Sequence, residues 1–421
     1  MTKRLFTLIG FLLLALPIYA QSTFPSDINL IIGYGQSLSL GSTDGLSINT
    51  KGLGYPNLWM FNTGLRLQKG EADSSLTHFV PLVEHKNEET PISGMADMMM
   101  KSFSDIRYTK KDYVFRTPGW GGKSVKLLRP NPVEPQYYTG FMRGVRQAKY
   151  IADQQKKSFN VPLFTWTQGE ADIYDGMDSI TYKQQLKSLY NEINEDVKHI
   201  TKQTNDVKCI LYQTASHNRY YHITNREDRK LNPAIAIAQY QMAKENKGFY
   251  LATPMYPFEY NLDNVHLCAE YSRLLGAYYG YIAKKVLEDQ QEWKPIYPTK
   301  ISIKGNKIVL KMHVPVKPLV IDTNWVQYID NYGFNVYRTD SAIDIASVSL
   351  TGPDEVTILC TEKLQDGDRI TYAINGENTG RFIGSRGNIR DSQGDKITYQ
   401  IGSTVYHLHN WLPIFEEKIK L

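Results

Sequence analysis

The stretch from Ile28 to Ser37, INLIIGYGQS, decides the fold. It opens with a short apolar run that has the length and composition of a buried strand. Gly33 and Gly35 follow, so the backbone can turn sharply and leave the hydroxyl of Ser37 exposed at the edge of a sheet. A serine in this place can be a nucleophile, although the same pattern also makes ordinary turns from a strand into a helix.

Four further runs downstream have the character of buried strands: 113–115, 161–166, 209–212 and 249–252. Between them, apolar residues recur at the three-and-four spacing of amphipathic helices. We predict one such helix to have Asn232 as its N-cap and Pro233 as its first residue, with Gly248 reversing the chain before the next strand. Strand and helix in alternation predict a three-layer α/β/α sandwich with a parallel sheet, which binds ligands beyond the carboxyl ends of its strands.

The pattern changes after Trp293. Pro295 and Pro298 mark a linker, and residues 301–310 alternate as two strands around a Gly-Asn hairpin turn. Further short strand-like runs follow, separated by Gly, Asp and Asn. We therefore predict an α/β domain over residues 21–293 and a small all-β sandwich domain over residues 294–421.

Residues 1–20 have the order of a signal peptide: a basic start, an apolar run and a final Ala20. We expect a soluble bacterial protein that is exported to the periplasm or secreted. Removal of this leader lowers the formal charge from +5 to +3, which gives no sign of a nucleic-acid partner. The three cysteines are an odd number, and the sequence does not decide whether Cys209 and Cys268 are bridged.

A second glycine-rich segment, WGGKSV at residues 120–125, follows the second predicted strand. It is not a phosphate loop, because Thr117 stands where that motif requires a glycine. Gly121 and Gly122 instead offer flexible backbone whose N–H groups could face a ligand, as an oxyanion hole requires.

A third segment, WTQGEAD at residues 166–172, follows the next strand. Gln168 could donate its side-chain amide to a developing oxyanion, while Glu170 and Asp172 offer acceptors that could hold the loop. For Asp172 we favour the plainer role of capping a helix.

A fourth segment, Asp263-Asn264-Val265-His266, precedes the last helix of the first domain. The carboxylate of Asp263 can reach the ring of His266 across one turn, fix its tautomer and steady its charge when it accepts a proton. An Asp-x-x-His step is also a common helix entry, and spacing alone favours neither interpretation.

Together the four segments resemble the conserved blocks of the SGNH hydrolases, and most closely the sialate O-acetylesterase-like and acetylxylan esterase branch. The resemblance covers residues 26–289, and Trp-x-Gln-Gly-Glu is its most specific element. It implies ester hydrolysis without a metal or organic cofactor, with Ser37 as nucleophile, His266 as base and then acid, and Asp263 orienting the histidine. The oxyanion hole would comprise the backbone N–H groups of Ser37 and Gly122 and the amide of Gln168.

Four further residues are candidates for secondary roles. Gln36, Gly121, Glu170 and His217 are candidates for loop support or substrate binding. Leu38 departs from the relatives, which often have Asn after the nucleophile, and this leaves the acyl pocket in question. The wider superfamily has Asn where Gln168 stands, although the acetylesterase branch is similar to this sequence in using Gln.

The expected substrate is an acetylated glycan of the sialic acid, xylan or pectin type. A sialic acid would call for an arginine facing its carboxylate, and we consider Arg116, Arg129 and Arg219. Two alternatives stay open, a catalytically silent sugar-binding protein and a lipid or thioester hydrolase. The intact set of Ser, His, Asp and Gln disfavours the first, and the lack of a long apolar lid segment disfavours the second.

Overall fold

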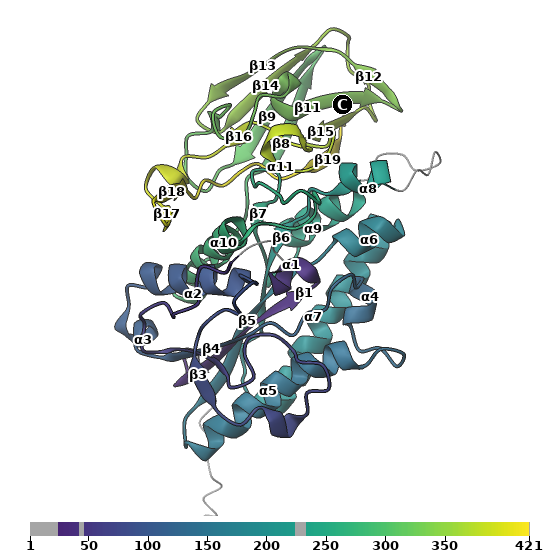
Figure 1. The fold of residues 1–421 in the computed structure, drawn as a ribbon. Helices are drawn as coiled ribbons and strands as arrows, with labels where there is room; N and C mark the ends of the chain where they lie inside the picture. The colour runs from purple at the N-terminus through teal and green to yellow at the C-terminus, as the bar shows by residue number, and fades with distance from the viewer. Residues whose placement is uncertain (1–23, 42–45, 224–232, 421) are drawn as a thin grey trace, which may run out of the picture.

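The computed structural model describes residues 24–41, 46–223 and 233–420 of this chain. A sheet with helices on both faces forms the first part, and a β-rich part sits beyond the carboxyl edge of that sheet (Figure 1). The predicted signal peptide lies outside the described residues. No described helix is long and apolar enough to cross a membrane.

The sheet has seven strands in the order β3-β2-β4-β1-β5-β6-β7. All neighbours are parallel except β2 and β3. The strands are β1 (Ile28–Gly35), β2 (Leu58–Phe61), β3 (Phe79–Pro81), β4 (Asp112–Arg116), β5 (Phe159–Thr167), β6 (Lys208–Gln213) and β7 (Phe249–Pro254). The five strands predicted from the sequence are confirmed, and β1, which leads to Ser37, lies at the centre.

Buried side chains alternate along β1 because both faces of the sheet are covered. Ile31 packs with one layer, α2 and α10, while Leu30 and Ile32 pack with the other, α5, α7 and much of α9 (Figure 1). The helices of this part are α1 (Ser37–Leu40), α2 (Pro91–Ser102), α3 (Ile106–Thr109), α4 (Val125–Leu128), α5 (Gln136–Gln154), α6 (Glu170–Asp175), α7 (Ser179–Thr201), α8 (His217–Ile223), α9 (Ala234–Glu245) and α10 (Ala269–Leu287), with a 3₁₀ turn at Asp73–Ser75. The predicted three-layer sandwich is therefore confirmed.

Helix α9 begins one residue later than the sequence predicted. Pro233 is its N-cap rather than its first helical residue, and the expected cap Asn232 lies outside the described residues. Gly248 does reverse the chain before β7, with a φ of 81° that favours glycine.

Helices α2 and α10 pack unusually closely because glycines meet backbone at their contact. A Cβ atom on Gly276 would lie 1.8 Å from the carbonyl oxygen of Pro91, and one on Gly94 would lie 1.9 Å from that of Arg273. Both positions therefore require glycine, and the pair holds one face of the sheet directly behind the loops that follow β1 and β7.

The C-terminal part is built of antiparallel sheets, as predicted. Two sheets of four strands, β12-β11-β15-β19 and β13-β14-β9-β8, are joined by two short pairs, β10-β16 and β17-β18. The strands are β8 (Tyr297–Lys304), β9 (Lys307–His313), β10 (Val320–Ile321), β11 (Phe334–Arg338), β12 (Ser341–Ile343), β13 (Ile345–Gly352), β14 (Glu355–Cys360), β15 (Arg369–Tyr372), β16 (Ile389–Arg390), β17 (Thr398–Ile401), β18 (Thr404–His407) and β19 (Phe415–Lys418), with helix α11 (Gly380–Ile383) and 3₁₀ turns at Asp330–Gly333 and Gln393–Asp395. The predicted hairpin is confirmed, with Lys304 opposite Lys307.

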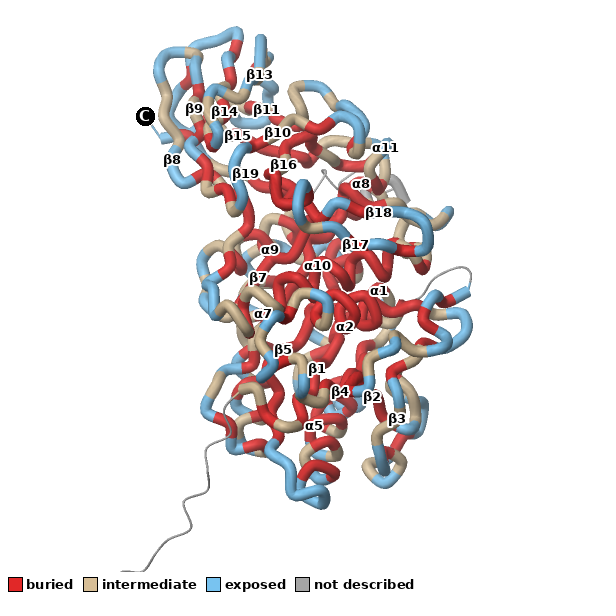
Figure 2. Tube along the Cα trace, turned by 90° about the vertical axis from the view of Figure 1, so that its left-hand side faces the viewer, coloured by how far each residue is buried: buried red, intermediate tan, exposed pale blue. Residues whose placement is uncertain are grey.

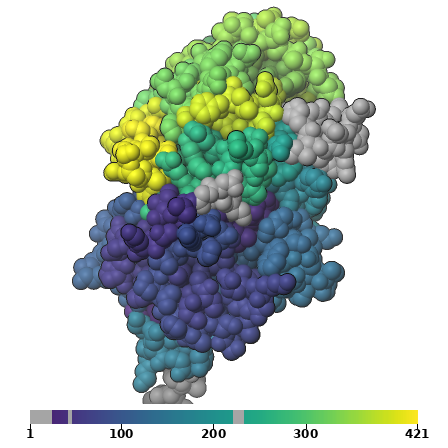
Figure 3. Space-filling model, viewed as in Figure 1, coloured from purple at the N-terminus to yellow at the C-terminus, as the bar shows by residue number. Residues whose placement is uncertain are grey.

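One hydrophobic cluster runs from the α2 and α10 layer into the β domain. In Figure 2 the buried backbone continues from α10 into the strands above it, and Figure 3 shows the two parts in contact over a broad front. The side-chain amide of Gln213 in β6 bonds both backbone groups of Ile414, each at 2.8 Å. Cys209, Cys268 and Cys360 are all free thiols.

Candidate active site

A chain of hydrogen bonds joins Ser37, His266 and Asp263. Ser37 is the first residue of α1, directly after β1, and its Oγ lies 2.7 Å from Nε2 of His266. The other ring nitrogen of His266, Nδ1, lies 2.5 Å from Oδ2 of Asp263. The structure thus brings together three residues from the loops after β1 and β7 in the order that a serine nucleophile, its base and an orienting carboxylate require.

The two carboxylate oxygens of Asp263 accept different hydrogen bonds. Oδ1 accepts the backbone N–H groups of Val265 and His266, both at 2.9 Å, while Oδ2 holds the His266 ring. The carboxylate therefore closes the turn and also contacts the histidine ring, but it does not cap the last helix of the first domain, because α10 begins at Ala269 with Cys268 as its N-cap. Partial burial raises the pKa of Asp263, but the hydrogen bonds from His266 and Val265 outweigh it and leave the pKa below its ordinary value. The carboxylate stays ionised, as stabilisation of an imidazolium requires.

The glycine turn after β4 lies beside the serine. A Cβ atom on Gly121 would be 3.8 Å from Cβ of Ser37, and the backbone N–H of Trp120 donates to Gly35 at 3.0 Å. Gly121 and Gly122 are exposed, and Gly122 has a φ of 67°. Because Ser37 opens a helix, its own N–H has no acceptor within that helix. Backbone donors from two loops therefore adjoin the nucleophile.

Gln168 is fully buried beneath this turn. Its amide nitrogen donates to Oδ2 of Asp172 and, at 3.2 Å, to the carbonyl oxygen of Lys123. Asp172 Oδ2 also accepts the N–H of Val125 at 3.0 Å. In this arrangement Gln168 and Asp172 clamp the segment that directly follows Gly122, and the role of Gln168 as an oxyanion donor stays a prediction. We name these two residues and the backbone they hold at 123–125 the loop clamp.

Asp172 is more than the helix cap that we favoured from the sequence. Burial raises its pKa to about 7, against the lowering effect of its bonds from Gln168 and Val125. Nothing in the sequence marks it as buried, since acidic residues are nearly always exposed unless they are paired.

Gln36 and Glu170 form hydrogen bonds that connect the loops around Ser37. Oε1 of Gln36 accepts the backbone N–H groups of Gly169 at 3.4 Å and Ala171 at 3.1 Å, which ties the serine loop to the start of α6. Glu170 accepts the hydroxyls of Tyr212, at 2.6 and 2.7 Å, and Thr214, at 2.7 Å. Burial raises the pKa of Glu170, and these hydroxyl donors partly offset that effect.

Comparison with solved structures places this arrangement among known folds. A carbohydrate acetylesterase from Xanthomonas citri superposes with a TM-score of 0.60 at 13% identity, over 93% of this chain and 80% of that one. This chain has the SGNH-hydrolase fold. Further matches with lower TM-scores are a protein from Arabidopsis thaliana (0.43, 13% identity, 62% of this chain and 100% of that one) and a carbohydrate acetylesterase from Sinorhizobium meliloti (0.33, 14% identity, 61% and 98%). No family model and no curated protein matches the chain in sequence.

Within this SGNH fold, His217 faces the β domain. It is 1% exposed, and its Nε2 lies 2.8 Å from the carbonyl oxygen of Ile374 and 2.9 Å from the hydroxyl of Ser385. Burial lowers its pKa to about 4. The structure therefore gives His217 a supporting position between the domains rather than one on the surface that substrate reaches.

The three arginines considered for a sugar carboxylate differ in their surroundings. Arg116 is fully buried and paired with Glu71, and Arg129 is paired with Glu192. Arg219, on α8 after β6, forms no ion pair with any residue that the structure describes. Of the three, Arg219 alone lies beyond the carboxyl end of a strand without an ion pair to a described residue.

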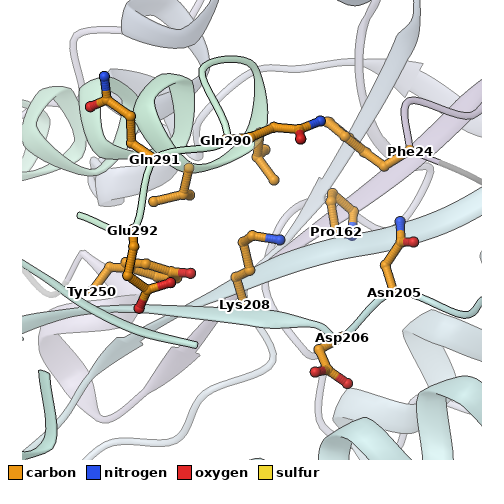
Figure 4. Close-up of a pocket in the computed structure, with 11 residues that line it drawn as sticks. Phe24, Pro162, Asn205, Asp206, Lys208, Tyr250, Gln290, Gln291 and Glu292 are labelled. Carbon is orange, nitrogen blue, oxygen red and sulfur yellow. The ribbon is translucent and has the colours of Figure 1, made fainter. Parts of the chain in front are cut away.

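A separate cavity of about 480 Å³ lies at the opposite edge of the SGNH sheet (Figure 4). It is lined by Lys208 and Tyr250, at the starts of β6 and β7, and by Gln290 to Glu292 after α10. These are the amino ends of the strands, whereas Ser37 and Gln168 follow carboxyl ends. The cavity is therefore no part of the triad site.

Proposed function

We propose that this protein is a serine-dependent carbohydrate O-acetylesterase, which hydrolyses acetyl esters on glycans and releases acetate. The observation that carries the proposal is the hydrogen-bond chain from Ser37 through His266 to Asp263 beside an exposed glycine turn. The fold shared with the Xanthomonas citri acetylesterase supports it over nearly the whole chain. The predicted leader suits an enzyme that meets its glycan in the periplasm or outside the cell.

The geometry suits a two-step acyl transfer. As Ser37 Oγ attacks the acetyl carbonyl, His266 Nε2 accepts its proton, and Asp263 stabilises the resulting imidazolium. The N–H groups of Ser37 and Gly122 would receive the negative charge on the carbonyl oxygen. His266 then returns the proton to the sugar oxygen, so the alcohol leaves and an acetyl-serine forms. Water, deprotonated by the same histidine, releases acetate and restores the serine.

The site is open rather than sunk in the molecule. Ser37 is half-buried, the side chain of His266 is 27% exposed and that of Asp263 is 45% exposed. Such an opening suits an ester that projects from a larger glycan. If the sugar carries a carboxylate, Arg219 is the group we propose to recognise it.

Acetate release from acetylated xylan, pectin and sialoglycans tests the proposal. We expect turnover on at least one of them, with Ser37→Ala as the inactive control, and a preference for acetyl over longer acyl chains in a series of nitrophenyl esters. A preference for long chains would favour lipid hydrolysis. Glycan binding without acetate release on any ester would favour the silent binding protein.

A further inference from the structure

The loop that carries Asp263 and His266 has little support from its own domain at its tip. Leu262 is fully exposed, and residues 259–266 are half-buried or exposed. Within the loop, the N–H of Asn261 donates to the carbonyl oxygen of His266 at 2.7 Å, and that of Asn264 donates to Asn261 at 2.9 Å. Asn264 has a φ of 57°, a left-handed conformation that asparagine adopts more readily than most residues other than glycine. Asp263 and His266 thus lie on a tight and largely exposed turn, so support from outside the loop can affect their positions.

The β domain supplies that support through a short segment that begins α11. The hydroxyl of Thr379 donates to the carbonyl oxygen of Asn264 at 2.9 Å, directly between Asp263 and His266 in the chain. The N–H of Arg381 donates to the carbonyl oxygen of Phe258 at 3.1 Å. Thr379 is 5% exposed, so its bond to the loop is shielded from water.

The arginine of this segment holds the start of the loop by its side chain. Nε of Arg381 donates to Oε1 of Glu259 at 2.8 Å, and its guanidinium lies 4.3 Å from the ring centre of Trp325. Trp325 in turn donates its ring N–H to the carbonyl oxygen of Pro257 at 3.0 Å. A Cβ atom on Gly380, whose φ is 84°, would approach the Phe258 carbonyl oxygen to 3.0 Å, so the two backbones lie close together.

We propose that Thr379 and Arg381 are positioning residues for the catalytic histidine, and that the β domain is in this sense part of the active site. The bond from Thr379 fixes the peptide between Asn264 and Val265, and with it the reach of His266 toward Ser37. This inference rests on the proposed function for its kinetic consequence, but its structural claim concerns the loop alone.

Substitution of Thr379 in the full-length protein tests the inference. Thr379→Val removes the hydroxyl and keeps the side-chain shape, whereas Thr379→Ser keeps the hydroxyl. Thr371 is a matched control, because it is buried in β15 of the same domain and its hydroxyl has no partner among the described residues. On 4-nitrophenyl acetate we expect Thr379→Val to lower kcat about three- to tenfold with KM within about twofold, as the loss of one hydrogen bond allows. Thr379→Ser and Thr371→Val should retain the wild-type kcat.

Hydrogen exchange of residues 258–266 provides a second readout that does not depend on activity. We expect about three- to tenfold faster exchange in Thr379→Val and in Arg381→Gln, with the strand β1 unchanged. Wild-type kcat and wild-type exchange in both variants would overturn the inference. If the wild type hydrolyses no ester, the proposed function fails, and the exchange of the loop decides the positioning role alone.

Discussion

The buried environment of Asp172 disfavours the ionised form of its carboxyl group. Its ordinary pKa near 3.8 rises to about 7 through burial, although two N–H groups donate to it. The unfolded chain therefore ionises first as the pH rises, so the folded state loses stability between about pH 4 and pH 7 and is constant above that range. Ionisation also strengthens the bonds that hold the loop clamp.

The variant Asp172→Asn should show how much stability the folded state loses when Asp172 ionises. The variant keeps an oxygen to accept from Val125 and Gln168, and its nitrogen takes the place of Oδ1, which has no partner among the described residues. Because asparagine does not ionise, we expect the Tm of the variant relative to wild type to rise as the pH goes from about 4 to about 7. Thermal unfolding at pH 4.5, 6 and 8, measured by circular dichroism, checks this. A Tm difference that does not change with pH would contradict the raised pKa.

Gln168 separates a catalytic from a supporting role. If its amide donates to the oxyanion, Gln168→Ala should lower kcat by roughly 10²- to 10³-fold with little change in KM, because the donor matters most in the transition state. Gln168→Glu should be at least as harmful, since a carboxylate repels the charge that develops. Steady-state kinetics on folded protein decides the matter: a near-normal kcat in Gln168→Ala would leave this residue only its place in the loop clamp.

The sequence indicated Ser37, Asp263 and His266, but it did not indicate most of the residues that hold their loops. Each of the three lies in a short loop next to a recognisable strand or helix, and the resemblance to the SGNH hydrolases joined them, since no segment was decisive by its spacing alone. The loop clamp could not be predicted from the sequence in this way, because Asp172 contacts Val125 only once the fold has brought the ends of β4 and β5 together. Nor is Thr379 legible, because it lies in another domain.

The contact between helices α2 and α10 depends on glycine. Gly276→Ala places a methyl group against the Pro91 backbone, which cannot give way as a side chain would. Despite the better helix propensity of alanine, we expect a loss of about 1 to 3 kcal/mol in the free energy of unfolding, the usual cost of overpacking. Denaturation by urea measures it, and a variant as stable as wild type, or more so, would show that the helices move apart without cost.

Long, strongly patterned elements were predictable, and short ones were not. Strands β1 and β5 carry continuous apolar runs because they are buried on both faces. Strands β2 and β3 could not be recognised in the sequence; they have four and three residues and lie toward one edge of the sheet. Such short stretches are fixed by pairing with a neighbour rather than by their own pattern.

The two domains share one hydrophobic cluster, and we expect them to unfold together. Gln213→Leu removes both bonds to the backbone of Ile414 and leaves buried polar groups unpaired, at a cost of roughly 1 to 3 kcal/mol each. Calorimetry should show one transition in wild type and one at lower temperature in the variant. Two resolved transitions in wild type would mean that the domains are independent.

The existence of the β domain could be predicted from its hairpin and from the change of sequence pattern after Trp293. The way in which it docks on the first domain could not. Contacts between Gln213 and Ile414, or Thr379 and Asn264, join residues more than a hundred positions apart. Local sequence patterns give no information about contacts between such distant residues. The interface between the two domains therefore became apparent only from the structure. The same is true of the contacts that the β domain makes with the loop that carries Asp263 and His266.

If Ser37 is the nucleophile of an esterase, the variant Ser37→Ala should release no acetate. The hydroxyl bonds only His266 among the described residues, so we expect the folded variant to stay within about 1 kcal/mol of wild-type stability. On the same acetylated substrate, wild type should release acetate continuously and acquire an acetyl group on Ser37, detectable by mass spectrometry after rapid quenching. The variant should do neither. Wild-type turnover by Ser37→Ala would contradict the account.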